Sequence, residues 1–194
     1  NRLDLNVVND SLVNTNVASL KADVTGSSND LTITEVSGLN IVAGNDVTLN
    51  GGDLNVKLNA GSLGGAGNIA VGAGTVNIQV PNGAVNLTTG TITAANLVLA
   101  ARDTSAVSTS VSNLAANITG GGLTVAEANG LNIGLGVVGA NNVAATGDIS
   151  IALNAGSLTS GAGVNGAINA GVNNVTLDRK STRLNSSHEW ISRM

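Results

Sequence analysis

Short triplets with apolar ends and usually a polar middle recur along the chain, and they restrict its fold more than any other feature. Alternation of apolar and polar residues is typical of half-buried β-strands, because successive side chains of a strand point to opposite faces. Between the triplets lie Gly, Asn, Asp and Ser, which adopt the backbone angles that tight turns need. The triplets occupy 31–33, 39–41, 47–49, 54–56, 69–71, 76–78, 85–87, 97–99, 123–125, 131–133, 149–151 and 175–177.

The spacing of the triplets predicts an all-β fold, a right-handed parallel β-helix (β-solenoid). Triplets commonly start seven or eight residues apart, so three strands and three corners make a coil of about 22–24 residues. Strands this short cannot each bury a face alone. In stacked coils each strand pairs with the strands above and below it, at about 4.7–4.9 Å per coil. We expect Asn side chains at outward and corner positions to form ladders between coils.

A second repeat is longer. LTITEVSGLNI (31–41) matches LTVAEANGLNI (123–133) in seven of eleven positions, at an offset of 92 residues. DLNVKLNAGSL (53–63) matches DISIALNAGSL (148–158) equally well, at an offset of 95. A unit of about 94 residues, or about four coils, follows. We predict a first unit over 1–96 and a truncated second unit over 97–177.

The two units differ in length where Gly, Asn and Ser are abundant. SSND (27–30) in the first unit stands against GG (121–122) in the second. Surface loops absorb such insertions at low energetic cost. We therefore expect this difference to lie in a loop.

One pair of segments is ambiguous between strand and helix. Val107, Val111, Leu114 and Ile118 follow helical spacing, as do the corresponding residues of 13–24, so a short helix is one interpretation. Two strands joined by a turn, 107–111 and 114–118, are favoured because Ser and Thr dominate the intervening positions.

The last seventeen residues differ in composition from the rest. They hold the only His, Trp and Met of the chain. DRKSTRLNSSH (178–188) resembles, codon for codon, the translation of a short-read sequencing adapter, and EWISRM (189–194) resembles its constant segment after the sample index. We predict that 178–194 is not native and does not fold with 1–177, which we expect to be an internal piece of a longer product. The alternative is a polar, basic tail that recruits a partner.

The composition of 1–177 excludes several classes. This stretch has ten acidic and four basic residues, so its net charge is 4 − 10 = −6, and it has no aromatic residue and no Cys. Nucleic-acid binding depends on Lys and Arg, so we expect none. A transmembrane helix needs about twenty consecutive apolar residues, and 1–177 contains no such run. Disorder is disfavoured because the chain is 42% hydrophobic and only 10% charged.

Catalytic patterns are absent from 1–177. A nucleophilic triad needs a base beside the Ser, and this stretch has no His or Cys. Glycoside cleavage needs paired carboxylates, whereas the acidic residues of 1–177 lie singly. Glu35 and Glu127 occupy the same place in the two units, which indicates a structural role. We predict no catalytic, cofactor-binding or metal-binding residue. The acidic residues considered are Glu35, Asp53, Asp103, Glu127 and Asp148.

Specific calcium binding is also disfavoured. GGAGNIAV (64–71) resembles part of a calcium-binding solenoid repeat, but Asn68 stands where the repeat needs Asp and no tandem copy follows. Without carboxylates the ion has no strong ligand.

Three segments resemble the passenger repeats of filamentous-haemagglutinin-like adhesins: GLNIVAGNDVTLNGGDLNV (38–56), GTITAANLVLAA (90–101) and SVSNLAANITGGGLTVAEANGLNI (110–133). The likeness covers essentially all of 1–177 and rests on the style of the repeat. It implies a right-handed β-helical stalk of a large bacterial exoprotein, secreted or at the cell surface. Such proteins pass an outer-membrane transporter by a two-partner or autotransporter route and attach to glycans or proteins of a host or cell surface. The diagnostic N-terminal secretion domain is absent from this sequence, so the route stays open.

We therefore expect a non-enzymatic structural and adhesive stalk segment. The alternative is a fragment of a β-helical polysaccharide-active enzyme, a lyase or a hydrolase.

Overall fold

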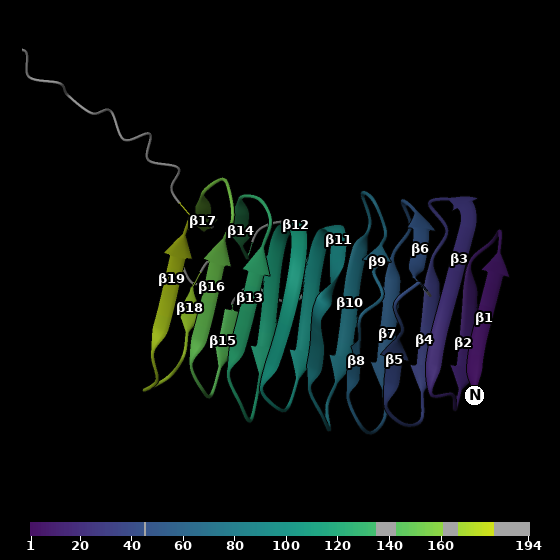
Figure 1. Ribbon diagram of the computed structural model, residues 1–194, viewed down its shortest axis with the longest axis horizontal. Helices are drawn as coiled ribbons and strands as arrows, with labels where there is room; N and C mark the ends of the chain where they lie inside the picture. Colours follow the sequence, from purple (N-terminus) through teal and green to yellow (C-terminus); the bar gives the residue numbers. More distant parts are fainter. Residues whose placement is uncertain (45, 135–142, 161–166, 181–194) are drawn as a thin grey trace, which may run out of the picture.

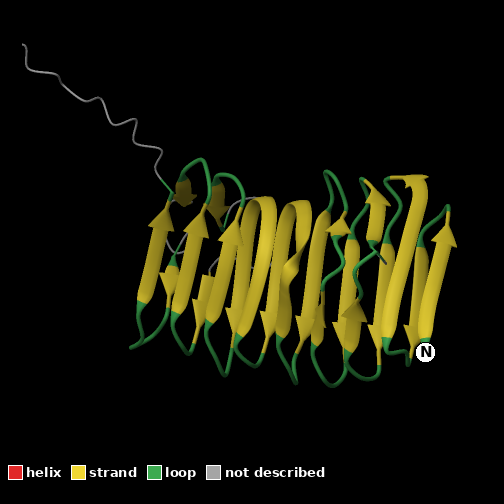
Figure 2. Ribbon diagram, in the orientation of Figure 1, coloured by secondary structure: helices red, strands yellow, loops and turns green. Residues whose placement is uncertain are grey.

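The computed structural model describes residues 1–44, 46–134, 143–160 and 167–180. Nineteen strands and no helix lie within these ranges (Figure 2). Every strand pairing is parallel, and the strands stack as a β-solenoid of about seven turns (Figure 1). The predicted parallel β-helix is thus confirmed, and the strand interpretation of 13–24 and 107–118 with it.

The solenoid has two faces of stacked strands, called here the front face and the back face as Figure 1 shows them. β11 (Val85–Ala101) and β12 (Ser105–Ile118) run over both faces. The front face also holds β1 (Arg2–Val7), β3 (Ser19–Ser27), β5 (Leu39–Ile41), β6 (Val47–Asn50), β8 (Leu63–Gly65), β9 (Ile69–Ala70), β13 (Leu123–Glu127), β16 (Ile149–Leu153) and β19 (Val175–Arg179). The back face holds β2 (Ser11–Thr15), β4 (Leu31–Glu35), β7 (Leu54–Leu58), β10 (Thr75–Val80), β14 (Leu131–Ile133), β15 (Val143–Ala145), β17 (Leu158–Ser160) and β18 (Ile168–Asn169).

The triplets form these strands as expected. All twelve lie in strands except that Val71 falls just beyond β9. Several strands carry no such triplet, among them β8, β15, β17 and β18, so the pattern underestimates how much of the chain is extended.

One continuous core of Leu, Ile, Val and Ala fills the space between the faces. Leu31 and Ile33 of β4 are buried and Thr32 is half-exposed, which is the alternation that a strand over a core requires. Sheets pack about 10 Å apart, and small branched side chains fill such a space without aromatic rings.

The turns of the solenoid, which are the coils predicted from the sequence, span a wider range of lengths than the predicted 22–24 residues. On the back face Leu31 pairs with Leu54, then Val76, Leu97 and Leu114, at steps of 23, 22, 21 and 17 residues. Ala116 pairs with Val143, 27 residues on. The shortest turn is possible because β12 bends from the front to the back face at Ser112 as continuous strand. The tight backbone turn expected between residues 111 and 114 is therefore absent.

The 94-residue unit is not a whole number of turns. From Leu31 four steps along the back face reach Leu114, yet Leu123, the counterpart of Leu31 in the second unit, lies on the front face beside Ser105. The unit thus covers about four and a half turns, and equivalent residues of the two units lie on opposite faces. The boundary at 96/97 falls inside β11, so both units share one core.

The strands at the C-terminal end of the described chain are the least covered. Val175 and Leu177 of β19 point to the core side but are 43% and 53% exposed. β19 continues past 177, since Asp178 and Arg179 pair with Ala152 and Leu153. The rest of the expected non-native tail, 181–194, lies outside the described residues.

Candidate functional site

Two glutamates are completely buried, one in each unit. Glu35 ends β4 on the back face and Glu127 ends β13 on the front face, and both are 0% exposed. A buried carboxylate needs hydrogen-bond donors, because leaving it unpaired is costly. The contacts of these two side chains therefore decide whether they are reactive or structural.

Glu35 ties two turns together. Its Oε2 accepts the backbone N–H of Val17 from the preceding turn at 3.0 Å. Its Oε1 accepts the backbone N–H of Ser37 at 3.1 Å and the hydroxyl of the same residue at 3.3 Å. The carboxylate thus satisfies donors at a corner where the chain leaves one face.

Glu127 repeats this arrangement, and two of the residues that donate to it are buried. The Thr109 hydroxyl donates to Oε2 at 2.7 Å, and the backbone N–H of Val111 donates to both oxygens at 3.2 and 3.3 Å. The backbone N–H of Asn129 donates to Oε1 at 3.0 Å. Thr109 and Val111 are themselves buried. Both glutamates are therefore engaged by neutral donors, which supports the structural role expected from their recurrence.

A polar ladder, called here the edge ladder, follows the back face at the corner where its strands begin. Each member contacts the next, one turn on. In the first part a carboxylate Oδ1 accepts the next backbone N–H, at 2.9, 2.8 and 2.7 Å, and in the second part side chains bond to each other, at 3.3, 2.8, 2.8 and 3.1 Å. The members are Asp10, Asp30, Asp53, Thr75, Asn96, Asn113, Asn132 and Thr159.

The expected Asn ladders are thus confirmed, but the acidic half was not foreseen. Its sequence signal is an Asp directly before a strand residue, as in NDLTI (29–33) and GDLNV (52–56). Asp53, one of the acidic residues considered above, stands in the middle of this half and accepts the N–H of Thr75.

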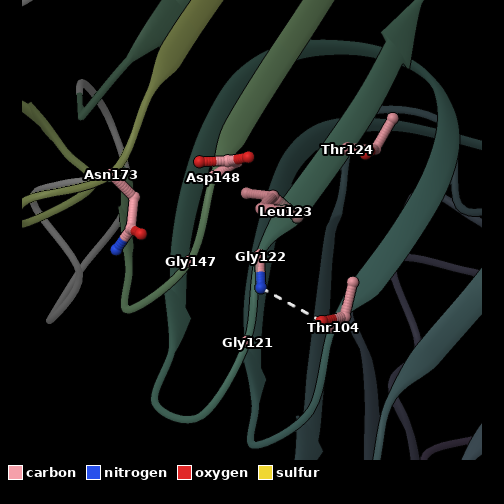
Figure 3. A pocket seen from close by; sticks show the side chains of 8 residues that line it. All are labelled: Thr104, Gly121, Gly122, Leu123, Thr124, Gly147, Asp148 and Asn173. Carbon is pink, nitrogen blue, oxygen red and sulfur yellow. Dashed lines mark hydrogen bonds between the residues drawn. The ribbon is translucent and has the colours of Figure 1, made fainter.

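The front face has the corresponding corner in the second unit, and there the row of side chains is interrupted. Thr104, Gly122, Asp148 and Asn174 directly precede stacked strand residues of β12, β13, β16 and β19. Gly122 has no side chain, and a groove of about 410 Å³ opens at this place (Figure 3). Its lining, called here the Gly122 groove, consists of Thr104, Gly121, Gly122, Leu123, Thr124, Gly147, Asp148 and Asn173.

The glycines of the groove cannot be replaced without movement of the backbone. A Cβ on Gly122 would lie 2.6 Å from the carbonyl oxygen of Asp148, and one on Gly121 would lie 2.3 Å from the backbone nitrogen of Thr104. The close approach of neighbouring turns therefore keeps the floor of the groove free of side chains.

The polar groups of the groove are only partly engaged. Asp148 Oδ1 accepts the backbone N–H of Asn174 at 2.9 Å, whereas its Oδ2 accepts no hydrogen bond from the described residues. The amide nitrogen of Asn173 donates to the carbonyls of Thr146 and Ala170 at 2.6 and 3.2 Å, which leaves its oxygen available. Thr104 Oγ1 accepts the N–H of Gly122 at 3.2 Å and retains its own proton to donate.

The other polar residues considered from the sequence lie apart from this groove lining. Asp103 pairs with Arg102 at 3.2 Å in a partly exposed ion pair. Asn68 accepts the N–H of Thr91 at 3.0 Å, and its own backbone N–H donates to Asp46 at 2.7 Å. Within the described ranges, no three His, Cys, Asp or Glu side chains are grouped so that they could hold a metal ion. None of the described residues forms a helix long and apolar enough to cross a membrane.

No family model, curated protein or solved structure matches this chain.

Proposed function

We propose that this chain is a structural and adhesive stalk segment of a large bacterial exoprotein, secreted or held at the cell surface. The observation that carries the proposal is the continuity of the stack. One core and one polar ladder run through both units, so successive turns support one another as in a spacer that can be lengthened by repetition.

The buried glutamates favour a load-bearing rod. Each one accepts hydrogen bonds from its own turn and from the preceding turn, so separating the two turns would leave donors of the preceding turn without their acceptor. Such coupling resists local opening of single turns. Parallel stacking also presents a long surface along the rod, which suits attachment over an extended area.

The partners proposed are glycans or proteins of a host or another cell surface, and an outer-membrane transporter during export. Support comes from the resemblance of the repeats to filamentous-haemagglutinin-like adhesins. The absence of Cys is compatible with passage through an oxidising compartment.

We propose a non-enzymatic role over the alternative of a polysaccharide-active enzyme. General acid and base or nucleophile roles in glycoside cleavage need two carboxylates on one site. Among the described residues that line the Gly122 groove, Asp148 is the single carboxylate. The buried Glu35 and Glu127 lie on opposite faces, each engaged by its own donors.

Two assays on one preparation test the proposal. The purified chain, immobilised on beads, is expected to retain epithelial or bacterial cells in a saturable way, and to release no reducing ends from surface polysaccharides. Retention no higher than that of uncoated beads contradicts the adhesive role. Turnover of a polysaccharide establishes the enzymatic alternative.

A further inference from the structure

We propose that the Gly122 groove binds one residue of a neutral, hydroxyl-rich glycan. This inference rests on the adhesive function proposed above and names a ligand class for one place on the rod. It comes from the difference between the two units at equivalent corners.

The groove exists because the second unit lacks a side chain that the first unit has. Asp30 in the first unit is the counterpart of Gly122, and Asp53 is the counterpart of Asp148. Asp30 fills its position and accepts the N–H of Asp53 at 2.8 Å. In the second unit the side chains of Thr104 and Asp148 instead stand two turns apart.

The width of the gap suits a single sugar ring. Neighbouring strands lie about 4.7–4.9 Å apart, so two turns separate Thr104 from Asp148 by about 9–10 Å. Figure 3 shows the side chains of Thr104, Asp148 and Asn173 around this space. Gly121 and Gly122 contribute only backbone to it, and Leu123 and Thr124 border it as well. A ring placed on the glycine floor can therefore reach polar groups on both sides.

The free hydrogen-bonding capacity of the groove is mainly that of acceptors. Asp148 Oδ2 and the side-chain oxygen of Asn173 are available, and the hydroxyls of Thr104 and Thr124 can donate or accept. A ligand that presents several O–H donors matches this set, and a sugar presents them in fixed directions around a ring.

Charge selects against anionic glycans. The groove holds one carboxylate and its lining includes no Lys, Arg or His. An acidic sugar in the groove would lie next to the Asp148 carboxylate without a compensating cation, and the two negative charges would repel each other. A neutral sugar avoids this repulsion.

The test is titration calorimetry of the full chain with mannotriose, cellotriose and maltotriose, and with sialyllactose as the acidic comparison. At least one neutral trisaccharide is expected to bind with a Kd of about 1 mM, the range of a few hydrogen bonds. Asp148→Asn keeps the acceptor for Asn174 but removes the charge, and should weaken binding about tenfold. The matched control is Asp53→Asn, the same change in the filled corner, which should leave affinity unchanged.

A second variant covers the case in which Asp148→Asn disturbs the fold. Thr124 is exposed and makes no side-chain hydrogen bond with the described residues, so Thr124→Arg can place a guanidinium over Asp148 without affecting the core. Binding should be lost while the melting temperature stays the same. Thr32→Arg, at the counterpart position on the back face, is its control and should bind normally.

Three results overturn the proposal: no neutral trisaccharide binds, sialyllactose binds more tightly, or the control variants lose as much affinity as the groove variants. Cell retention separates this outcome from failure of the stalk function. Beads that retain cells although the trisaccharides do not bind refute the groove and leave adhesion standing. Beads that retain none refute adhesion itself.

Discussion

The two sequence units keep the same buried carboxylate but differ at the corner in front of it. Glu35 and Glu127 end equivalent strands and accept equivalent backbone N–H groups. A few residues earlier, Asp30 fills a corner of the first unit that Gly122 leaves open in the second. The two units thus keep the same buried glutamate, whose hydrogen bonds join neighbouring turns. The residue at the corner differs between the units, and this difference can form a site without disturbing the core.

The two units also face opposite ways. Because the unit covers about four and a half turns, the filled corner lies on the back face and the open one on the front face. A rod built from such units would present equivalent surfaces alternately on its two sides. Substitutions at paired positions can therefore separate what depends on the local sequence from what depends on position along the rod.

The largest contrast is expected in the core. Ile78 of β10 is fully buried, whereas its counterpart Leu177 of β19 is 53% exposed. Ile78→Ala should lower the free energy of unfolding by about 2–5 kcal/mol through lost burial and a cavity. Leu177→Ala should cost less than about 1 kcal/mol. Urea unfolding followed by circular dichroism measures both, and equal losses would mean that further chain covers β19 in solution.

The buried glutamates come next. Glu127→Ala leaves the Thr109 hydroxyl and the N–H groups of Val111 and Asn129 without their acceptor, and should cost about 3 kcal/mol. Glu35→Ala should cost about 2 kcal/mol, because Val17 and Ser37 are only half-buried and water can reach their donors. Glu127→Gln, which keeps one oxygen, serves as the control and should give an intermediate loss. A larger loss for Glu35→Ala than for Glu127→Ala would contradict this ranking.

The edge ladder gives the smallest contrast. Asn113 donates to Asn96 at 2.8 Å and accepts from Asn132 at 2.8 Å, whereas its counterpart Ser19 has no side-chain hydrogen bond with the described residues. Asn113→Ala should cost about 1 kcal/mol and Ser19→Ala close to nothing. Hydrogen exchange of the amides of β12 and β14 should rise for the first variant alone. Unchanged exchange for Asn113→Ala would show that the ladder adds no stability.

The sequence predicts the strands well because alternation is a local property. Triplets such as 31–33 and 149–151 carry apolar residues at the spacing of one strand face, and apart from Val71 all of their residues lie in strands. The Asn ladders follow for the same reason, since equivalent polar positions of stacked strands are neighbours.

The number of residues in the unit could not show that it covers about four and a half turns, which is called here the half-turn offset. A repeat of 94 residues fits four long turns as well as four and a half shorter ones, and only strand pairing distinguishes them. The short turn through Ser112 hides the difference, because β12 bends there without a turn motif such as Gly or Asn-Gly. The Gly122 groove was missed because it depends on an absent side chain between two turns that are distant in sequence.

Disulfide formation between engineered cysteines tests the half-turn offset most directly, since the native sequence has no Cys. Ser108 and Ala126 are partners on the front face, at a spacing that permits a disulfide. A unit of four whole turns would instead stack β13 on the back-face part of β11, with Leu123 beside Leu97 and Ala126 beside Ala100. Under mild oxidation, Ser108→Cys/Ala126→Cys should cross-link rapidly and Ala100→Cys/Ala126→Cys should not. Cross-linking of the second pair in preference to the first would contradict the offset and, with it, the placement of the groove opposite its filled counterpart.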